Sequence, residues 1–218
     1  MFEVVILNVR PELQQYEFDT LLNLVSLEKQ ARIRKFHFFN DSRNCLISDI
    51  LARIEICRTT GFNNGQLEFS TNEYGKPFLI NNPHIYFNIS HADQYVAFAI
   101  ADEPVGIDIE IIKPIDLKIA NRFFTPDEET YILAGNRVQR FYEIWTKKES
   151  NIKWEGKGLY KALTSFSVLT PSEQVQLYYH CIFQNEECIS YVCSTKQVMP
   201  NIRKVDTSFL LNAQKLLR

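Results

Sequence analysis

The sequence lacks any apolar run near the roughly 20 residues that a membrane-spanning helix requires. Its first residues, MFEVVILNV, also lack the basic flank and the small-residue cleavage site of a signal peptide. Its five cysteines are odd in number and include no CxxC pair, which favours reduced thiols over disulfides. These absences predict a soluble, cytoplasmic protein that does not associate with membranes.

The chain also lacks an excess of positive charge, since it has 24 Lys and Arg residues, 26 Asp and Glu residues and a net charge of −2. This balance argues against electrostatic binding to nucleic acid, so a local cluster of cations must hold any anionic ligand. Glycine is scarce, with 7 residues, whereas 16 Phe and 10 Tyr contribute to a hydrophobic content of 45%. Such a content supplies the core of one large domain or two small ones.

The stretch VGIDIEI, Val105–Ile111, is typical of a strand because apolar side chains occupy alternate positions. Gly106, Asp108 and Glu110 share the other face, where like charges repel unless a cation lies between them. Mg²⁺ suits such a face, because it takes one or two protein carboxylates and fills its other positions with water and phosphate oxygens. The simpler interpretation is a half-buried strand with a solvated acidic face. The small Gly106 leaves room for another group to approach the backbone.

A third carboxylate, Glu149, is predicted on the apolar face of a helix. Phe141, Trp145, Glu149 and Ile152 are spaced four, four and three residues apart, so they share one face. Acidic side chains are rare on such a face unless they are paired or bind a metal. An ion pair with Lys153, one turn further on, is the simpler alternative. The acidic strand favours a metal site for phosphate chemistry instead.

Other segments offer cations to an anion. Lys29 and Arg32 lie on one face of a helix expected from Glu12 to about Phe39, and they form either an anion-binding patch or an ordinary solvated face. A turn at YGKP presents a flexible glycine, a cation and a rigid proline, and is either a phosphate contact or a simple β-turn. Ser90 and His91 are expected in a turn between strands, where a histidine either recognises phosphate or decorates the surface.

The order of the predicted elements indicates an α+β fold. Asp41 is expected to cap a helix that ends at Gly61, and Thr125 to open a capping box before a helix that ends at Gly135, with Asn136 capping the next. Strands are expected at 165–169, 175–183, 188–194 and 208–211. Both halves then run strand, helices and antiparallel strands, which predicts two similar subdomains, 1–103 and 104–218, with a ligand site at their junction.

Four motifs occur in the order and at roughly the spacing of one enzyme family: YGKPF, FNISHA, GIDIE and a WTKKES run that continues to NIKWEGKG. The chain resembles the 4′-phosphopantetheinyl transferases, in particular the larger, single-chain, surfactin-type enzymes that activate nonribosomal peptide synthetases. The resemblance covers about residues 25 to 170, and the combined motifs are highly specific. It implies two subdomains with pseudo-twofold symmetry and a coenzyme A cleft between them. It also implies transfer of the phosphopantetheine arm to a carrier-protein serine, with release of adenosine 3′,5′-bisphosphate.

The resemblance also assigns roles to individual residues. The metal ligands fall on Asp108, Glu110 and Glu149, with Mg²⁺ or Mn²⁺ as the ion. Glu149 is the implied base for the carrier serine, directly or through a water, and Lys153 the acid or charge stabiliser. The implied contacts of the co-substrate coenzyme A are Lys29, Arg32, Gly75, Lys76, Pro77, Ser90 and His91.

The chain departs from the family pattern in two places. An arginine followed by threonine is common in the second helix, where this chain has Asn44 and Cys45, with Arg43 one residue early. Ala92 stands where serine is common. Both departures weaken an inferred contact with the coenzyme: Arg43 as a phosphate contact is in doubt, and one hydrogen bond is lost at Ala92.

The implied partner is an acyl or peptidyl carrier protein, which we expect to dock around Arg122-Phe123-Phe124 and the loop Gly156-Lys157-Gly158 of a monomer. Two alternatives remain at this point. One is a binding module that holds carrier proteins or coenzyme A without turnover. The other is a metal-dependent nuclease built on Asp108, Glu110 and Lys113, which leaves FNISHA, YGKPF and Glu149 without a role.

Overall fold

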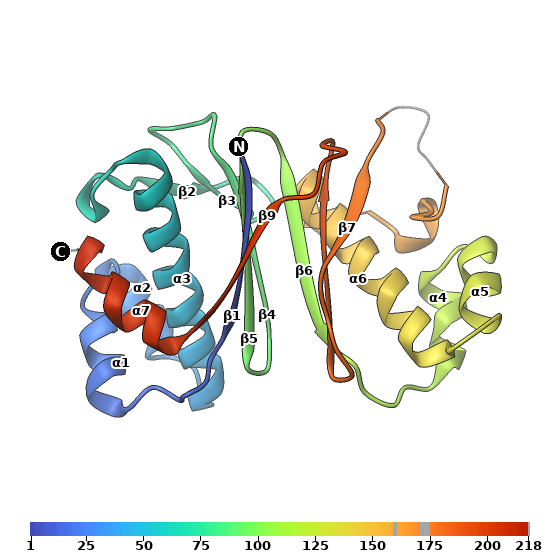
Figure 1. Cartoon of the computed structure of the whole chain (residues 1–218), viewed down its shortest axis with the longest axis horizontal. Coiled ribbons are helices and arrows are strands. Elements are labelled where there is room, and N and C mark those ends of the chain that lie inside the picture. Colours follow the sequence, from blue (N-terminus) through green and yellow to red (C-terminus); the bar gives the residue numbers. More distant parts are fainter. Residues whose placement is uncertain (159–160, 171–174, 218) are drawn as a thin grey trace.

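The computed structural model describes residues 1–158, 161–170 and 175–217 and has the α+β fold that the sequence predicts. Two β-sheets face each other in the middle of the molecule, and helices cover the outer side of each sheet (Figure 1). The layers therefore follow the order helix, sheet, sheet, helix. No helix in the described ranges is both long and apolar enough to cross a membrane.

The first sheet has four strands in the order β4-β5-β1-β9. β1 (Phe2–Asn8) pairs antiparallel with β5 (Tyr95–Ala101), and β5 pairs antiparallel with β4 (Tyr86–Ala92). β9 (Asn201–Asp206) comes from the far end of the chain and runs parallel to β1. The helices on this side are α1 (Gln15–Leu22), α2 (Leu27–Ile33), α3 (Phe39–Thr60) and α7 (Thr207–Ala213), with the short 3-10 helices η1 (Asn64–Gln66) and η5 (Gln214–Leu217).

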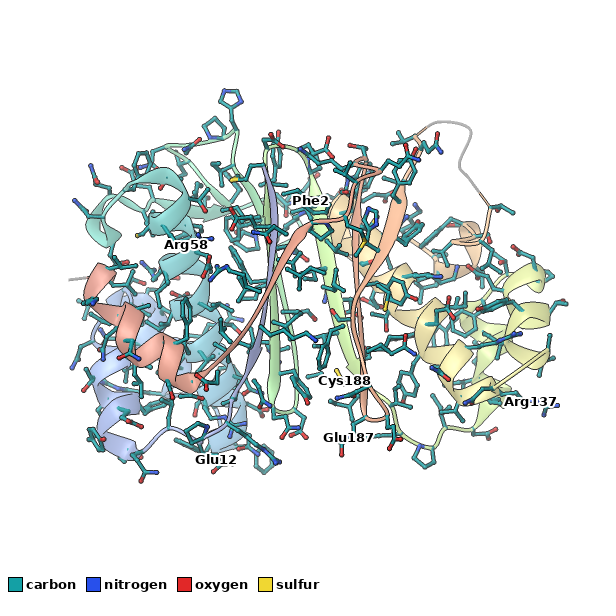
Figure 2. The ribbon with its side chains drawn as sticks, viewed as in Figure 1. Phe2, Glu12, Arg58, Arg137, Glu187 and Cys188 are labelled. Carbon is teal, nitrogen blue, oxygen red and sulfur yellow. The ribbon has the colours of Figure 1, made fainter. Side chains whose placement is uncertain are left out.

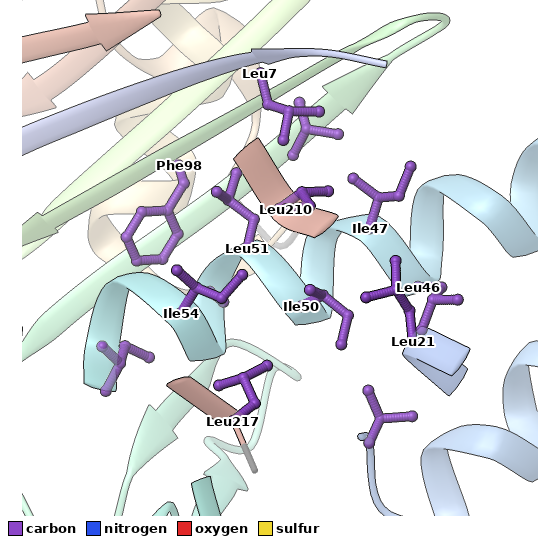
Figure 3. Packing of buried hydrophobic residues seen from close by; sticks show 14 of the residues in the cluster. Leu7, Leu21, Leu46, Ile47, Ile50, Leu51, Ile54, Phe98, Leu210 and Leu217 are labelled. Atoms are coloured by element: carbon purple, nitrogen blue, oxygen red, sulfur yellow. The ribbon is translucent and has the colours of Figure 1, made fainter. Parts of the chain in front are cut away.

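The core of this side forms around α3. Leu46, Ile50 and Ile54 recur at helical spacing and are fully buried. Phe98 of β5 and Leu210 of α7 pack against the same helix (Figure 3). Each such side chain contributes about 1.5–3 kcal/mol when it is fully buried, so α3 fixes the helices to the sheet.

The second sheet has three antiparallel strands in the order β6-β8-β7. These are β6 (Val105–Ile111), β8 (Cys188–Ser194) and β7 (Tyr178–Gln184). The long helix α6 (Arg137–Glu155) packs on its outer face. The remaining elements are α4 (Ala120–Phe123), α5 (Pro126–Leu133), the 3-10 helices η2 (Leu117–Ile119) and η4 (Leu163–Ser165), and a separate hairpin of β2 (Phe69–Thr71) and β3 (Pro77–Leu79).

The inner faces of the two sheets pack on each other through small and branched side chains. Val4, Ala99 and Ile107 are completely buried there. Figure 2 shows the side chains that fill this layer, with Phe2 labelled on the first sheet and Cys188 on the second. The apolar face predicted for Val105–Ile111 is therefore the face that joins the two halves of the molecule.

Local signals predict the ends of three helices correctly. Gly61 ends α3 in the left-handed conformation, with φ +75°. Thr125 and Glu128 form the predicted capping box at the start of α5, and Asn136 accepts a hydrogen bond from the Gln139 N–H at the start of α6. These ends depend on hydrogen bonds within one turn, so neighbouring residues are enough to specify them.

Two predictions for the first half are wrong. The helix expected from Glu12 to Phe39 is two helices, because Ser26 caps a new one by accepting a hydrogen bond from the Lys29 N–H. Asp41 does not cap α3, which begins earlier, at Phe39. The Phe39 ring packs against Phe18, with 5.5 Å between ring centroids, so a tertiary contact accompanies the earlier start.

Two predictions for the second half are also wrong. Residues 165–169 form no strand, because the Lys148 ammonium takes the carbonyl oxygens of Leu163 and Phe166 as hydrogen-bond partners. Residues 208–211 lie in the helix α7 instead of a strand. Asp206 starts this helix by accepting a hydrogen bond of 3.2 Å from the Phe209 N–H. The final strand lies just before it, as β9.

Candidate active site

The site lies where the edge strand of one sheet meets the edge strand of the other. β4 and β6 have no shared backbone ladder, and side chains of β4 bridge the gap. Asn88 Oδ1 accepts a hydrogen bond of 2.9 Å from the Ile107 N–H, and Ser90 Oγ donates one of 3.0 Å to Asp108 Oδ1. The turn expected around Ser90 and His91 is only the pair Asp93-Gln94, so both residues belong to β4.

Asp108 is the centre of the site. It is only 3% exposed, so the alternative of a solvated acidic face is wrong. Its Oδ1 accepts hydrogen bonds from Lys153 Nζ at 2.6 Å and from Ser90 Oγ, and the same ammonium donates to Ser90 Oγ at 2.8 Å. Its Oδ2 is buried and has no hydrogen-bond partner among the described residues. Burial raises the pKa of Asp108, although the Lys153 charge opposes this effect.

Gly106 lets α6 approach this strand. A Cβ atom at this position would lie 2.0 Å from the Ser150 carbonyl oxygen and 2.3 Å from the Trp154 nitrogen. The group that occupies the room left by glycine is therefore the backbone of α6 itself. This contact sets Glu149 and Lys153 of the helix opposite the acids of the strand.

Glu110 and Glu149 complete the acidic group. Glu110 Oε1 accepts a hydrogen bond of 3.0 Å from Trp145 Nε1. Burial, followed by the charge of Asp108, raises the pKa of Glu110 to about 7. Burial and the same charge raise the pKa of Glu149, which makes no hydrogen bond or ion pair within the described part of the chain. The alternative of a Glu149–Lys153 ion pair is wrong, because Lys153 pairs with Asp108.

The carboxylates are ligands of the type that a hard divalent cation prefers, but they do not lie close enough together to form a complete coordination site. Among the described residues, no three Asp, Glu, His or Cys side chains stand close enough together to hold a metal ion. Among the described residues, Asp108 Oδ2 is a buried anionic oxygen without a donor, and the half-buried Glu149 makes no hydrogen bond or ion pair, although the Lys153 charge lies near it. Burying such oxygens costs free energy unless a cation or donor meets them. The donor set therefore fits Mg²⁺ once the carboxylates close around it.

The predicted turn at Gly75, Lys76 and Pro77 lies against the end of α6. Gly75 has φ +86°, which explains the glycine. Lys76 Nζ donates hydrogen bonds to the carbonyl oxygens of Val105, Lys153 and Trp154. Burial lowers the pKa of Lys76 to about 8. Its ammonium is thus bonded to main-chain oxygen atoms beside the acidic group.

The predicted cations of the first half lie in different surroundings. Lys29 Nζ is 3.0 Å from Asp49 Oδ2, in an ion pair with α3, whereas Arg32 is exposed and has no partner within the described residues. His91 is exposed at the end of β4, and crowding by protein atoms and the nearby Lys153 charge lower its pKa. Their roles as coenzyme contacts stay predictions.

Arg43 is buried rather than turned toward solvent. It is 4% exposed, its guanidinium donates to Asn44 Oδ1 at 3.3 Å, and it lies 3.5 Å from Glu12 Oε1. Asn44 in turn donates to the Asp93 carbonyl oxygen at 2.9 Å. Asn44, which stands where the family commonly has arginine, therefore holds the β4–β5 turn near His91, and Arg43 holds the Asn44 side chain.

Sequence reasoning missed two contributors to the site. Asn88 bridges the sheets through a single side-chain oxygen, and nothing in an alternating strand pattern marks it. Trp145 was expected only as an apolar residue, yet its indole N–H orients Glu110. An indole N–H needs a partner when it is buried, so a Trp one turn before Glu149 was an available signal. Phe124, expected on a docking surface, is instead buried against Phe141.

Comparison with known proteins agrees with this arrangement of motifs. Residues 10–103 match the family described as 4′-phosphopantetheinyl transferase, N-terminal, and residues 104–204 match the 4′-phosphopantetheinyl transferase superfamily. The chain is 42% identical over 159 residues to the 4′-phosphopantetheinyl transferase Sfp of Bacillus subtilis, covering 72% of this chain and 71% of the relative. It is 34% identical over 219 residues to the enzyme gsp of Aneurinibacillus migulanus, covering 96% of this chain and 92% of the relative.

A third relative, the 4′-phosphopantetheinyl transferase psf-1 of Bacillus pumilus, is 40% identical over 163 residues, which cover 73% of this chain and 68% of the relative. The family matches include both sides of the β4–β6 junction and all the residues of the acidic group. The chain therefore belongs to the 4′-phosphopantetheinyl transferases, in their surfactin-type subfamily.

Proposed function

We propose that the chain transfers the 4′-phosphopantetheine group of coenzyme A to a serine of an apo acyl or peptidyl carrier protein. The serine Oγ forms a bond to the phosphorus that carries the pantetheine arm. The bond from that phosphorus to the bridging oxygen breaks, and adenosine 3′,5′-bisphosphate leaves. The observation that carries the proposal is the junction of β4, β6 and α6. There Lys153 bridges Ser90 and Asp108, and one carboxylate oxygen of Asp108 has no partner.

The coenzyme would lie in a cleft between two subdomains, 1–103 and 104–218, related by pseudo-twofold symmetry. The proposal of symmetry draws support from the two long helices, because α3 packs on the first sheet and α6 on the second. β9 and α7 return to the first sheet, so the last elements of the second subdomain pack on the first. We further propose a cytoplasmic monomer, in keeping with free thiols at all five cysteines.

The anionic groups of the coenzyme need local cations, because the chain has no overall positive charge. Lys29, Arg32 and His91 would contact the 3′-phosphate and the pyrophosphate. Ser90 would offer its hydroxyl, which already lies between Lys153 and Asp108. The turn Gly75-Lys76-Pro77 would complete the coenzyme site through its main chain, beside the end of α6.

Asp108, Glu110 and Glu149 would hold Mg²⁺, or Mn²⁺, in this site. A bound divalent ion supplies positive charge to the pyrophosphate oxygens as negative charge moves onto the leaving group. Trp145 keeps the Glu110 carboxylate in place through its indole N–H. Ser90 and Lys153 hold Asp108 Oδ1, which leaves Oδ2 for the ion.

Two groups of the chain would move protons or charge during transfer. Glu149 lies at the site without a hydrogen bond, and burial raises its pKa, which suits a base for the hydroxyl of the carrier serine. Lys153 Nζ has three N–H donors and donates two hydrogen bonds, one to Ser90 and one to Asp108. The third can stabilise or protonate the oxygen of the departing bisphosphate.

The carrier protein would dock beside the same junction. Arg122 is exposed, Phe123 is half-buried against Trp145, and Lys157 is exposed in the loop after α6. These residues present one apolar and two basic groups beside α6, with Phe123 against Trp145 and Lys157 just past the end of the helix. Carrier proteins of suitable chemistry would be acidic around the reactive serine.

A single assay tests the proposal. The protein is incubated with coenzyme A, Mg²⁺ and an apo carrier protein, and mass spectrometry follows the phosphopantetheine adduct. We expect an adduct on the carrier serine that requires the divalent ion. Tight binding of coenzyme A with no adduct on any carrier tested would favour a binding module, and cleavage of DNA would favour a nuclease.

A further inference from the structure

We infer that the turn between β2 and β3, residues Asn72–Lys76, is a brace that caps the end of α6 and thereby positions Lys153. The role of the brace in transfer rests on the proposed function, whereas the contacts that form the brace do not. It assigns the Lys76 side chain a mechanical role, which differs from contact with a phosphate. The brace joins three segments that are far apart in the sequence: the β2–β3 turn, the start of β6 and the last turn of α6.

The argument begins with the hydrogen bonds of the Lys76 ammonium. An ammonium has three N–H donors and no acceptor. Lys76 Nζ lies 3.0 Å from the Val105 oxygen, 2.6 Å from the Lys153 oxygen and 3.3 Å from the Trp154 oxygen, all of them main-chain carbonyls. Every donor is therefore used. A phosphate could bind the ammonium only by displacing one of these carbonyls.

The carbonyls that Lys76 binds are those a helix cannot satisfy by itself. The last four carbonyl groups of an α-helix lack an N–H partner one turn further on. α6 ends at Glu155, and the Gly156 N–H takes only the Ile152 oxygen, at 2.9 Å. Lys153 and Trp154 are left with free carbonyls, and Lys76 supplies both partners. A cation at this end also interacts favourably with the helix dipole.

Asn72 supports the brace from the other end of the turn. Its Nδ2 donates to the Gly156 oxygen at 2.8 Å, just past the helix. Its Oδ1 accepts hydrogen bonds from the N–H groups of Tyr74 and Lys76, at 3.0 and 2.9 Å, so it also shapes the turn. A Cβ atom at Gly156 would lie 2.9 Å from Lys76 Cδ, which indicates how closely the turn and the helix end fit.

The bonds of Lys76 fix two segments that carry the site. The Val105 oxygen lies three residues before Asp108 on β6, and the Lys153 oxygen belongs to the residue whose ammonium bonds Asp108. One side chain thus sets the distance between the strand and the helix where they hold the acid and the lysine. Loss of the brace should therefore loosen the last turn of α6 and displace Lys153, while the coenzyme keeps its own contacts.

Hydrogen exchange tests the brace without reference to activity. We expect amides of residues 152–158 to exchange faster in Lys76→Met and in Asn72→Ala than in the wild-type chain, with α3 unchanged. Lys196→Met is the matched control, because Lys196 pairs with Asp102 at the surface and its side chain makes no hydrogen bond to α6 among the described residues. Unchanged exchange at the end of α6 in both variants would overturn the inference.

Kinetics separate a brace from a coenzyme contact. For Lys76→Met we expect kcat to fall by roughly 10²-fold, as for a small misplacement of a catalytic group. We expect the Kd of coenzyme A, measured by calorimetry, to stay the same. Lys76→Arg keeps a positive charge and several N–H donors, so this variant should recover part of kcat. A weaker Kd with unchanged kcat would overturn the inference in favour of a phosphate contact. If the wild-type chain shows no transfer, the proposed function fails, and hydrogen exchange still decides the brace.

Discussion

Two lysine–carboxylate pairs anchor the same helix, α6, and they differ in what they leave unsatisfied. Lys148 Nζ lies 2.8 Å from Glu128 Oε2, and neither side chain is exposed at all. Lys153 Nζ lies 2.6 Å from Asp108 Oδ1, at a site that is partly open on the lysine side. The two lysines are five residues apart, so the helix presents one pair to its own subdomain and the other to the junction between the sheets.

The first pair is complete. The Lys148 ammonium also donates to the carbonyl oxygens of Leu163 and Phe166. The Glu128 carboxylate also accepts from the Thr125 and Val168 N–H groups, both at 2.9 Å. Every donor and acceptor has a partner, which is the condition under which a buried charge pair is tolerated.

The second pair is incomplete. Asp108 Oδ2 has no partner, Lys153 keeps one free donor, and Glu149 has no partner within the described residues. The comparison teaches that burial of a charge pair does not by itself distinguish structure from function. What distinguishes them is whether atoms remain available for a ligand.

The largest effect should follow from breaking the complete pair. Lys148→Met leaves a buried carboxylate without its cation, and we expect the free energy of unfolding to fall by about 3–5 kcal/mol. Urea denaturation followed by circular dichroism measures this loss. The double variant Lys148→Met, Glu128→Gln should recover part of it. A loss below about 1 kcal/mol would make the pair equivalent to a surface ion pair.

Breaking the incomplete pair should affect catalysis more than stability. For Asp108→Asn we expect the rate of transfer to fall by about 10²–10³-fold or more, because a charge that stabilises the transition state is lost. The same denaturation assay should show a smaller loss of stability than Lys148→Met. Transfer near the wild-type rate, with Mg²⁺ present, would refute the role of Asp108. Glu149→Ala should behave in the same way.

A change at Gly106 should disturb the contact that brings the incomplete pair together. In Gly106→Ala the new Cβ would meet the Ser150 oxygen, so α6 must move away from β6. We expect a loss of about 1–3 kcal/mol in the free energy of unfolding and a reduced rate of transfer. Gly65→Ala is the control, since its Cβ would meet only Asn63 Oδ1, at 3.5 Å. Equal stability of the two variants would contradict the close approach.

Lys76 extends the comparison to a buried lysine that has carbonyl partners and no carboxylate partner among the described residues. Burial lowers its pKa to about 8 from an ordinary value of 10.5. Between these values the unfolded chain binds more protons than the folded chain, so stability due to this group rises with pH. Between pH 8 and pH 10.5 we expect the free energy of unfolding of the wild type to rise relative to that of Lys76→Met, by at most about 1.4 kcal/mol per pH unit. Parallel pH profiles of the two would contradict this.

The smallest effect on stability should come from a partly exposed pair at the surface, Lys29–Asp49. Surface pairs contribute about 0–1 kcal/mol, so Lys29→Met should unfold at nearly the same urea concentration as wild type. Its affinity for coenzyme A should still fall, and more so at low salt, because screening weakens the contact that is lost. Calorimetric titration at two salt concentrations measures this. Unchanged affinity at both would remove Lys29 from the coenzyme site.

The sequence predicts the parts of this protein that depend on neighbouring residues. The alternation in Val105–Ile111, the capping box at Thr125 and the glycine stop at Gly61 are all confirmed, because strand faces and helix ends follow from contacts within a few residues. The same reasoning places Asp108 and Glu110 on the face opposite the inner core.

Contacts between distant segments could not be predicted in this way. Nothing in the run WTKKES indicates that Lys148 pairs with Glu128, or that its ammonium binds the carbonyl oxygen of Phe166, within the strand expected at 165–169. The helical spacing of Glu149 and Lys153 allowed an ion pair between them, but Lys153 pairs instead with Asp108 on β6. Partner choice depends on tertiary packing, which a local pattern does not contain.

β9 gives the protein a particular order of assembly. Its parallel pairing with β1 joins residues 201–206 to the very first strand, and α7 and η5 then close over α3. During synthesis the outer edge of β1 must stay open until residues 201–206 have left the ribosome. An open strand edge can pair with other chains. The nascent protein is therefore exposed to misassembly while β1 lacks β9, and a truncation that removes β9 would leave that edge uncovered.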